Sequence, residues 1–306
     1  MAAEVVACLP RLDPVQAHLF KVPAKLINEG ADLSRFLVST GYRDILTFLG
    51  QLNRSMFPAK TAPETTLDDL DQKQNYVSAS VLGLRALLKE LDQLIELAPP
   101  DPGPRRFGNI SFRKWFELVQ TQSRSLLETH LPPAVASFPH VDDTDSIDEL
   151  KTYLLGSFGS AQRLDYGTGH ELSFVAFLGG MWKLGGFFEA EKIEVEREIV
   201  LGVVQPYLAL VRKLILTYSL EPAGTHGVWG LDDHSFVPYI FGSAQYGPAI
   251  SEQDLTPTEG SLPGSPDPGD VVKMDRVAAL RDGNMYMDRN TGTFSIWKQV
   301  SGTDKR

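Results

Sequence analysis

One polar, glycine-punctuated stretch, RLDYGTGHE at residues 163–171, runs directly into the most continuously apolar segment of the chain. That segment, residues 172–184, is apolar nearly all round, which predicts a central, buried helix rather than a surface helix. Gly167 and Gly169 can adopt positive φ without a steric cost, so we expect a sharp turn that aims successive N–H groups at one point. The stretch, called the signature loop below, therefore predicts a functional site at the start of a core helix.

The chemistry of the signature loop favours an anionic ligand. The first N–H groups of a helix have no partner inside the helix and lie at the positive end of its dipole. Arg163 adds a forked donor and Thr168 a hydroxyl, a set that suits a phosphate or a carboxylate. A structural interpretation stays open beside this one: a capped helix start in which Asp165 and His170 have local partners.

Two familiar motifs are excluded at this loop. A dinucleotide fingerprint, GxGxxG, needs glycine where Leu172 stands, and no strand pattern precedes the loop. A zinc-protease motif, HExxH, needs histidine where Phe174 stands.

Bulk properties are typical of a globular protein. A chain of 306 residues that is 42% hydrophobic can bury a sizeable core in one large domain or two smaller ones. The net charge of -10 argues against binding to duplex nucleic acid. Cys8 is the single cysteine, which indicates a reducing compartment. We identify neither a secretory signal at the N-terminus nor an uninterrupted apolar run of membrane-spanning length.

Apolar residues at spacings of three and four predict an all-α fold, because no stretch shows the sustained alternation of a strand. The predicted helices occupy residues 32–55 (two helices joined near Gly41), 68–97, 111–127 with Ser111 as the cap, a short stretch after an acidic turn at 142–148, 172–184, and 189–219 with a kink at Pro206.

The domain organisation follows from the proline and glycine content. A helical domain is expected over residues 1–250, with a candidate sub-boundary at the proline-rich linker 99–104. Residues 251–283 have the composition of a flexible Pro/Gly-rich insertion, and 284–306 form a separate C-terminal tail.

A second concentration of site-like chemistry, called the second loop below, lies at residues 221–236, where prolines and glycines frame Trp229, Asp232 and Asp233. Loops of this kind carry function more often than cores do. The paired aspartates beside a tryptophan are compatible with a metal site, an acid/base pair or a cap for a helix that starts near Phe236.

The signature loop resembles that of the phosphotyrosyl phosphatase activators, the PTPA family of serine/threonine protein phosphatase 2A activators and peptidyl-prolyl isomerases, in its fungal type. Further blocks similar to the family stand in family order over residues 18–250: RFGN at 106–109, the Trp115 helix, EPAG at 221–224, GVWGLDD at 227–233 and GSAQ at 242–245. The resemblance implies a compact, multi-helix, all-α fold with a linker or lid region.

The resemblance also implies an ATP and Mg²⁺ site. The positions that match the nucleotide contacts of the family are Arg163, Thr168 and Gly169. The positions that match its magnesium ligands are Gly227, through the carbonyl, and Asp233, which are hard oxygen donors of the kind that magnesium accepts.

A peptidyl-prolyl isomerase needs no nucleophile. It lowers a barrier of about 18–20 kcal/mol by binding the twisted X-Pro amide better than either planar form. We expect Trp229 and Tyr166 to form apolar walls against the proline ring, and Asp165, His170 and Asp232 to hold the peptide backbone.

The resemblance implies an activator of protein phosphatase 2A that acts as a peptidyl-prolyl cis-trans isomerase and engages the phosphatase in an ATP/Mg-dependent way. Its partners would be the phosphatase catalytic subunit and a proline-containing peptide, with neither nucleic acid nor membrane, in the cytoplasm and also the nucleus. The alternative is a non-catalytic chaperone that clamps the catalytic subunit and promotes loading of its metals.

The C-terminal tail departs from the family pattern. Family members follow an Asn-Met-Tyr with a Gly-Pro-Phe-x-Glu-His-Ser segment that completes the nucleotide pocket. Here Asn284, Met285 and Tyr286 are present, but residues 287–297 have a different sequence.

Overall fold

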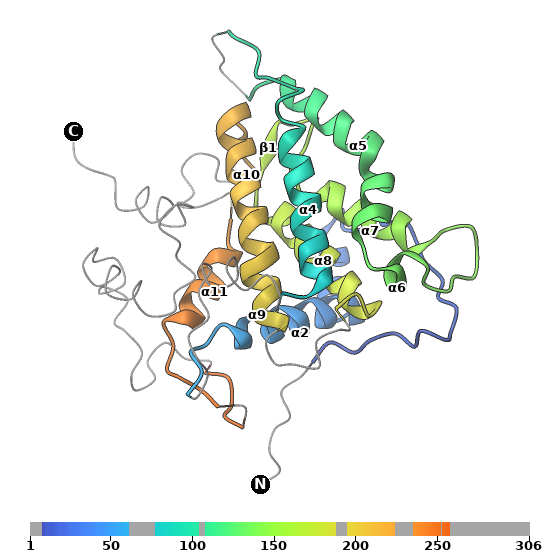
Figure 1. Ribbon diagram of the computed structural model, residues 1–306, viewed down its shortest axis with the longest axis vertical. Coiled ribbons are helices and arrows are strands. Elements are labelled where there is room, and N and C mark those ends of the chain that lie inside the picture. Colours follow the sequence, from blue (N-terminus) through green and yellow to red (C-terminus); the bar gives the residue numbers. More distant parts are fainter. Residues whose placement is uncertain are drawn as a thin grey trace, which may run out of the picture.

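Helices dominate the structure, a computed structural model that describes residues 8–60, 77–103, 108–187, 195–223, 235–251 and 253–257. This confirms the all-α prediction (Figure 1). The elements are α1 (Gly30–Leu37), α2 (Thr40–Ser55), α4 (Ala79–Gln93), α5 (Ser111–His130), α6 (Pro133–Ala136), α7 (Ser146–Gly156), β1 (Asp165–Tyr166), α8 (Thr168–Lys183), α9 (Val195–Ile199), the π-helical segment η2 (Val200–Val204), α10 (Gln205–Tyr218), β2 (Glu221–Pro222) and α11 (Val237–Gln245).

Helix α8 is the buried helix that the sequence predicts. It packs against α7 and α2, while α4 packs against α5 and α10 on the side nearer the viewer in Figure 1. Its middle contributes some of the most deeply buried side chains of the core: Phe174, Val175, Phe177, Leu178, Met181 and Trp182. Because these residues are inside, the first turn of α8 is fixed at the edge of the core.

A widened helical turn, rather than a simple kink, accommodates Pro206. The helix is continuous through α9, η2 and α10, and Pro206 stands in the first turn after the π-helical segment. Proline has no N–H to donate and its ring collides with the carbonyl four residues earlier. A π-turn removes that collision by changing the register of the hydrogen bonds. All five residues of η2 are buried, so the wider turn is held by packing.

The same helix has the length and hydropathy of a membrane-spanning segment. Val195–Tyr218 is 24 residues long with a mean hydropathy of 1.7 in its most apolar window, although Arg212 and Lys213 interrupt its apolar run. That window is 67% buried inside the protein, which is the position of a core helix.

The break between α1 and α2 falls at residues 38–39, close to the predicted position near Gly41, since the Ser39 hydroxyl accepts the N–H of Tyr42. The start of α5 differs in the residue that supplies the cap. Ser111 is the first residue of α5 rather than its cap. The Asn109 side chain accepts the N–H of Ser111 instead.

Helix α4 is shorter than the predicted helix over 68–97. It starts at Ala79, where the Ser78 hydroxyl accepts the N–H of Val81, and it ends at Gln93, before a turn over residues 94–97. Residues 68–76 lie outside the described residues, as does residue 104 at the end of the 99–104 linker.

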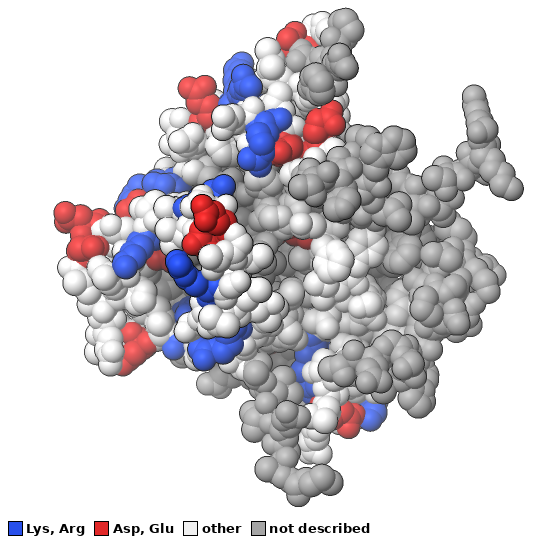
Figure 2. Space-filling model, turned by 180° about the vertical axis from the view of Figure 1, so that it is seen from behind, with Lys and Arg blue, Asp and Glu red and all other residues white. Residues whose placement is uncertain are grey.

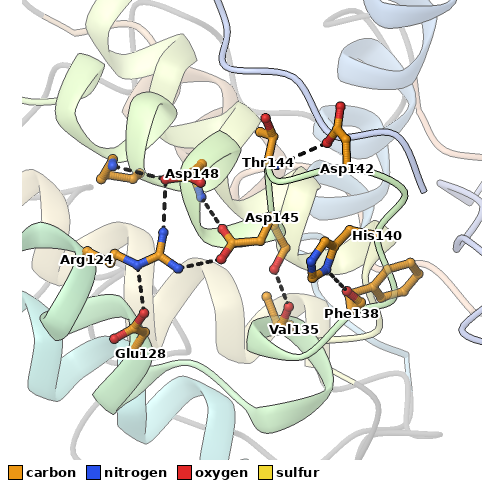
Figure 3. A network of polar contacts seen from close by, with 11 residues as sticks. Arg124, Glu128, Val135, Phe138, His140, Asp142, Thr144, Asp145 and Asp148 are labelled. Carbon is orange, nitrogen blue, oxygen red and sulfur yellow. Dashed lines mark hydrogen bonds and ion pairs between the residues drawn. The ribbon is translucent and has the colours of Figure 1, made fainter. Parts of the chain in front are cut away.

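The acidic turn at residues 142–148 caps α7 and also joins it to α5 (Figure 3). Asp145 accepts the N–H of Asp148 at 2.9 Å and so caps α7. The guanidinium of Arg124 on α5 bonds Asp145 and Asp148, and its Nε lies 2.9 Å from Glu128. On the face shown in Figure 2, acidic and basic side chains are interspersed over the described surface.

Gly83 on α4 marks a close approach of two helices. A Cβ at this position would lie 2.3 Å from the backbone carbonyl oxygen of His130 in the last turn of α5. Gly50 on α2 provides a matched control, since a Cβ there would meet nothing within 4 Å.

We predict that Gly83→Ala lowers the free energy of unfolding by about 1–3 kcal/mol, because the helices must separate. Gly50→Ala should raise it by about 0.5–1 kcal/mol through better helix propensity. Urea denaturation of both variants measures the difference, and equal effects at the two positions would contradict the close packing.

Candidate functional site

The signature loop presents some of its predicted ligands to solvent and buries others. Arg163, Thr168 and Gly169 are exposed, His170 is partly buried, and Asp165 is buried. The three exposed residues are the predicted nucleotide contacts. They surround the start of a 16-residue helix, where the N–H groups of the first turn point outward from the helix end.

The turn is not built on the glycines that the sequence suggested. Gly167 is extended, with φ of -169°, and Gly169 is already inside α8, so the expected positive φ at both positions was wrong. Positive φ occurs earlier, at Gly159 (104°) and at Leu164 (56°). A Cβ at Gly159 would lie 2.6 Å from the carbonyl oxygen of Asp165, so glycine is required there for the chain to fold back on itself.

The donors at the start of α8 fit an anion such as a phosphate. The Nε of Arg163 donates to Asp165 Oδ2 at 2.6 Å, which orients the guanidinium and leaves its two Nη groups outside that bond. Thr168 adds a hydroxyl and a main-chain N–H, and Gly169 a second main-chain N–H. A guanidinium with oriented N–H groups at a helix start is a recurrent way to bind phosphate.

Asp165 and His170 both have local partners, although only one of the two carboxylate oxygens of Asp165 is bonded. His170 Nδ1 lies 2.7 Å from the carbonyl oxygen of Gly156, which can only accept, so Nδ1 carries the proton. Its Nε2 lies 3.9 Å from Asp165 Oδ1, too far for a hydrogen bond. Asp165 Oδ1 is buried and has no hydrogen-bond partner among the described residues. The loop therefore keeps one unsatisfied acceptor beside the imidazole.

Tyr166 faces the core rather than solvent. Its side chain has 0% exposure, and its hydroxyl lies 2.7 Å from that of Tyr207, which donates to the carbonyl of Ser157 at 2.8 Å. Burial raises the pKa of both phenols well above the usual value. The ring stacks beneath His170, with 5.7 Å between ring centroids. In this conformation the Tyr166 ring packs between the loop and the core. Its role as an apolar wall for a proline ring stays a prediction.

Backbone pairing brings the start of the second loop to the signature loop. Strands β1 and β2 are parallel, with Asp165 opposite Glu221 and Tyr166 opposite Pro222. The N–H of Glu221 donates to the carbonyl of Leu164 at 2.9 Å, and that of Ala223 donates to Tyr166 at 2.8 Å. The first residues of the second loop, 221–223, therefore lie beside the signature loop.

The end of the second loop is held by a residue that the sequence analysis did not single out, Glu171. Its Oε2 accepts the N–H groups of Phe236 and Val237, at 2.7 and 2.8 Å, at the start of α11. Burial raises the pKa of Glu171 to about 7, although both N–H bonds lower it. An acidic residue in a first helical turn usually acts on its own helix. Here its partners lie 65 and 66 residues away, which no local pattern indicates.

The predicted residues Gly227, Trp229, Asp232 and Asp233 lie outside the described residues. Within the described part of the chain, no group of three or more His, Cys, Asp or Glu side chains could hold a metal ion. Asp232 and Asp233 were also considered as caps for the helix that starts near Phe236. Glu171 already accepts the first N–H groups of that helix, α11.

The raised pKa of Glu171 predicts a pH-dependent stability. The folded carboxyl holds its proton to about pH 7 and the unfolded one to about 4.5, so the native state binds more protons between these values. The free energy of unfolding therefore falls as pH rises through that range. We expect Glu171→Gln to remove a contribution on the order of 2–3 kcal/mol from this dependence.

Thermal unfolding of both proteins from pH 5 to pH 8 measures this contribution. Wild type should lose stability relative to Glu171→Gln as pH rises, since other titrating groups cancel in the difference. Parallel curves would show that Glu171 does not titrate in this range.

Known proteins resemble this chain in sequence and in fold. A family model described as Phosphotyrosyl phosphate activator (PTPA) protein matches residues 23–291, which extends past the limit of 250 expected from the motifs. The serine/threonine-protein phosphatase 2A activator 1 of Aspergillus fumigatus is 56% identical over 283 residues, 91% of this chain and 59% of the relative. That of Emericella nidulans is 54% identical over 290 residues, 94% of this chain and 67% of the relative.

A solved structure shows the same fold. The crystal structure of the PP2A phosphatase activator Ypa1 PTPA1 matches with a TM-score of 0.68 and 31% identity, over 95% of this chain and 81% of that chain. The present chain spans 59% of the length of the Aspergillus fumigatus relative. The matched family model covers most of the chain, including both loops of the site, and the chain belongs to the phosphotyrosyl phosphate activator (PTPA) protein family.

Proposed function

We propose that the protein activates serine/threonine protein phosphatase 2A and that the signature and second loops form the ATP- and Mg²⁺-dependent surface that engages the phosphatase catalytic subunit. The relatives from Aspergillus fumigatus and Emericella nidulans are named as phosphatase 2A activators, which supports this assignment. The observation that carries it is the cluster of exposed donors at the start of α8, with both ends of the second loop anchored beside it.

In this proposal, the signature loop binds the nucleotide phosphates. Arg163 contributes its Nη groups, Thr168 its hydroxyl and Gly169 its N–H. The metal is bound from the second loop by the Gly227 carbonyl and the Asp233 carboxylate. Bound Mg²⁺ would neutralise phosphate charge, so that the nucleotide and the metal each favour binding of the other.

The finer proposal is a peptidyl-prolyl cis-trans isomerase. A surface that fits the twisted X-Pro amide accelerates its rotation without covalent chemistry. Asp165 and His170 lie together in the signature loop, and one Asp165 oxygen is buried without a partner among the described residues, so the loop must open before this oxygen can accept a peptide N–H. Trp229 and Asp232 would complete the surface from the second loop.

One observation favours a second candidate, a non-catalytic chaperone that clamps the phosphatase and promotes loading of its metals. Tyr166, proposed as an apolar wall, is fully buried and bonded to Tyr207. A chaperone that only binds the phosphatase does not need an exposed Tyr166 ring. The proposed isomerase pocket, by contrast, lacks one of its two apolar walls while Tyr166 is buried.

Two assays on the same preparation separate these functions. The first measures activity of the phosphatase 2A catalytic subunit with and without this chain, each with Mg-ATP or with EDTA. The second measures isomerisation of a proline-containing peptide without phosphatase. Activation accompanied by isomerisation supports the isomerase, and activation alone supports the chaperone. If the chain neither activates nor binds the catalytic subunit, the proposed function is wrong.

We predict that Arg163→Ala weakens ATP binding by about ten- to a hundredfold, since a hydrogen bond to a charged group contributes about 1.5–3 kcal/mol. Arg35→Ala, at an exposed arginine on α1, is the control and should leave affinity unchanged. Calorimetric titration with Mg-ATP measures both. Equal affinity in wild type and Arg163→Ala would remove this residue from the site.

We predict that Asp233→Asn weakens the Mg²⁺ dependence of ATP binding and leaves the melting temperature nearly unchanged. The reason is that Glu171 already bonds the first N–H groups of α11, so this helix does not need Asp233 as its cap. A lower melting temperature with an intact Mg²⁺ response would instead identify Asp233 as a structural cap.

A further inference from the structure

Arg113, in the first turn of α5, holds the main chain that leads into the signature loop. Its Nε donates to the carbonyl oxygen of Ala161 at 3.0 Å, and its Nη2 donates to the carbonyl oxygen of Gln162 at 3.3 Å. Both acceptors lie almost fifty residues further along the chain, at 48 and 49 residues. Gln162 directly precedes Arg163, so this contact ends one residue before a proposed phosphate donor.

The two carbonyls lie at the tip of a tight turn of the backbone. Ser160 and Asp165 form an antiparallel bridge across this turn, and the N–H of Leu164 donates to the carbonyl of Ser160 at 2.7 Å. The N–H of Arg163 donates to the Ser160 hydroxyl at 3.2 Å. No main-chain N–H of the described residues bonds the carbonyls of residues 161 and 162. Arg113 therefore supplies from another helix the donors that the turn itself does not.

A guanidinium suits this pair of acceptors better than other cations. It is planar and presents its N–H groups in a fixed geometry, so two bonds define both the position and the orientation of the consecutive carbonyls. Arg163 is in turn attached through its side chain, since its Nε donates to Asp165 Oδ2 at 2.6 Å. The main chain before Arg163 and the side chain of Arg163 thus have separate attachments.

A second contact between the start of α5 and the signature loop lies at Gly108. A Cβ at this position would be 2.7 Å from the Cβ of Leu164 and 3.1 Å from its carbonyl oxygen, so glycine permits a close approach of the two segments. The residues around the start of α5 therefore contact the chain on both sides of Arg163, at residues 161–162 through Arg113 and at Leu164 through Gly108.

We propose that Arg113 is a positioning residue that holds the main chain before Arg163 against α5, so that the Arg163 guanidinium is presented to the nucleotide phosphates in one orientation. This inference rests on the proposed function. Arg113 bonds carbonyls of the protein and acts on the nucleotide through Arg163. Without Arg113, the turn at residues 160–163 gains conformational freedom, and part of the free energy of nucleotide binding is then lost in ordering it.

Calorimetric titration with Mg-ATP compares wild type, Arg113→Ala and Arg113→Lys. Arg113→Ala should weaken ATP binding by roughly fivefold, the scale expected when one side chain must be ordered on binding. Arg113→Lys keeps a cation that can bond one carbonyl but not the fork that bonds two, so its affinity should be intermediate.

Arg124→Ala is the matched control on the same helix. Its guanidinium bonds Asp145 and Asp148 on the side of α7, so its loss should lower the melting temperature and leave ATP affinity unchanged. If Arg124→Ala weakens ATP binding as much as Arg113→Ala does, the effect of Arg113 reflects the general stability of α5 and the inference is wrong.

A double-mutant cycle tests whether Arg113 acts through Arg163. Residues that act through one contact have effects that do not add. Arg113→Ala should therefore weaken ATP binding in the wild-type background, but by less than about twofold in the Arg163→Ala background. An equal loss of affinity in both backgrounds would show that Arg113 does not act through Arg163.

Amide hydrogen exchange supplies a readout that needs no nucleotide. The amides of Arg163 and Leu164, which both donate to Ser160, should exchange faster in Arg113→Ala than in wild type, with little change at Val81 at the start of α4. Unchanged exchange at these two amides, or unchanged ATP affinity in Arg113→Ala, would overturn the inference alone. Absence of ATP binding by wild type would overturn the ATP-dependent part of the proposed function and this inference with it.

Discussion

The burial of α8 fixes the position of its first turn, where the described residues that we assign to nucleotide binding lie. Its apolar body is held by side chains of the core, so its first turn cannot move relative to the helices around it. That turn is also where the polarity of the helix and the open N–H groups favour an anion. One helix therefore contributes its apolar body to the core and its first turn to the proposed ligand site.

Buried polar contacts attach the loop before α8 to the core. Tyr166 and Tyr207 form a hydrogen-bonded pair that ends on the carbonyl of Ser157, and Tyr207 stacks on Phe174 at 3.6 Å between ring centroids. Phenols that bond one another in the core specify a single arrangement, because each alternative leaves a hydroxyl unsatisfied. The exposed part of the loop can therefore present Arg163 and Thr168 in a fixed relation.

The second loop joins this scaffold at both ends by contacts of different kinds. Backbone pairing at β1 and β2 determines where residues 224–234 begin, and the Glu171 carboxylate determines where they end. The described residues on either side of 224–234 are therefore attached to the signature loop and to α8, although they lie more than fifty residues away in the sequence.

The sequence predicted the parts of this structure that follow from local patterns. The apolar period revealed α8 and the all-α fold, and the exposed Arg163, Thr168 and Gly169 stand where a helix start was expected. The two-residue strands could not be predicted from the sequence, because a segment of two residues is too short to show the alternation of apolar and polar side chains. The burial of Tyr166 and the contact of Glu171 with α11 both depend on partners far along the chain.

The central claim is that the signature loop and the second loop form one nucleotide site. Photolabelling with an ATP analogue that carries an aryl azide on the γ-phosphate, followed by tryptic mapping, tests it most directly. The account predicts label in two peptides, residues 164–183 and 214–273, both suppressed by excess Mg-ATP. Label confined to other peptides, or label in these two that excess Mg-ATP does not suppress, would contradict it.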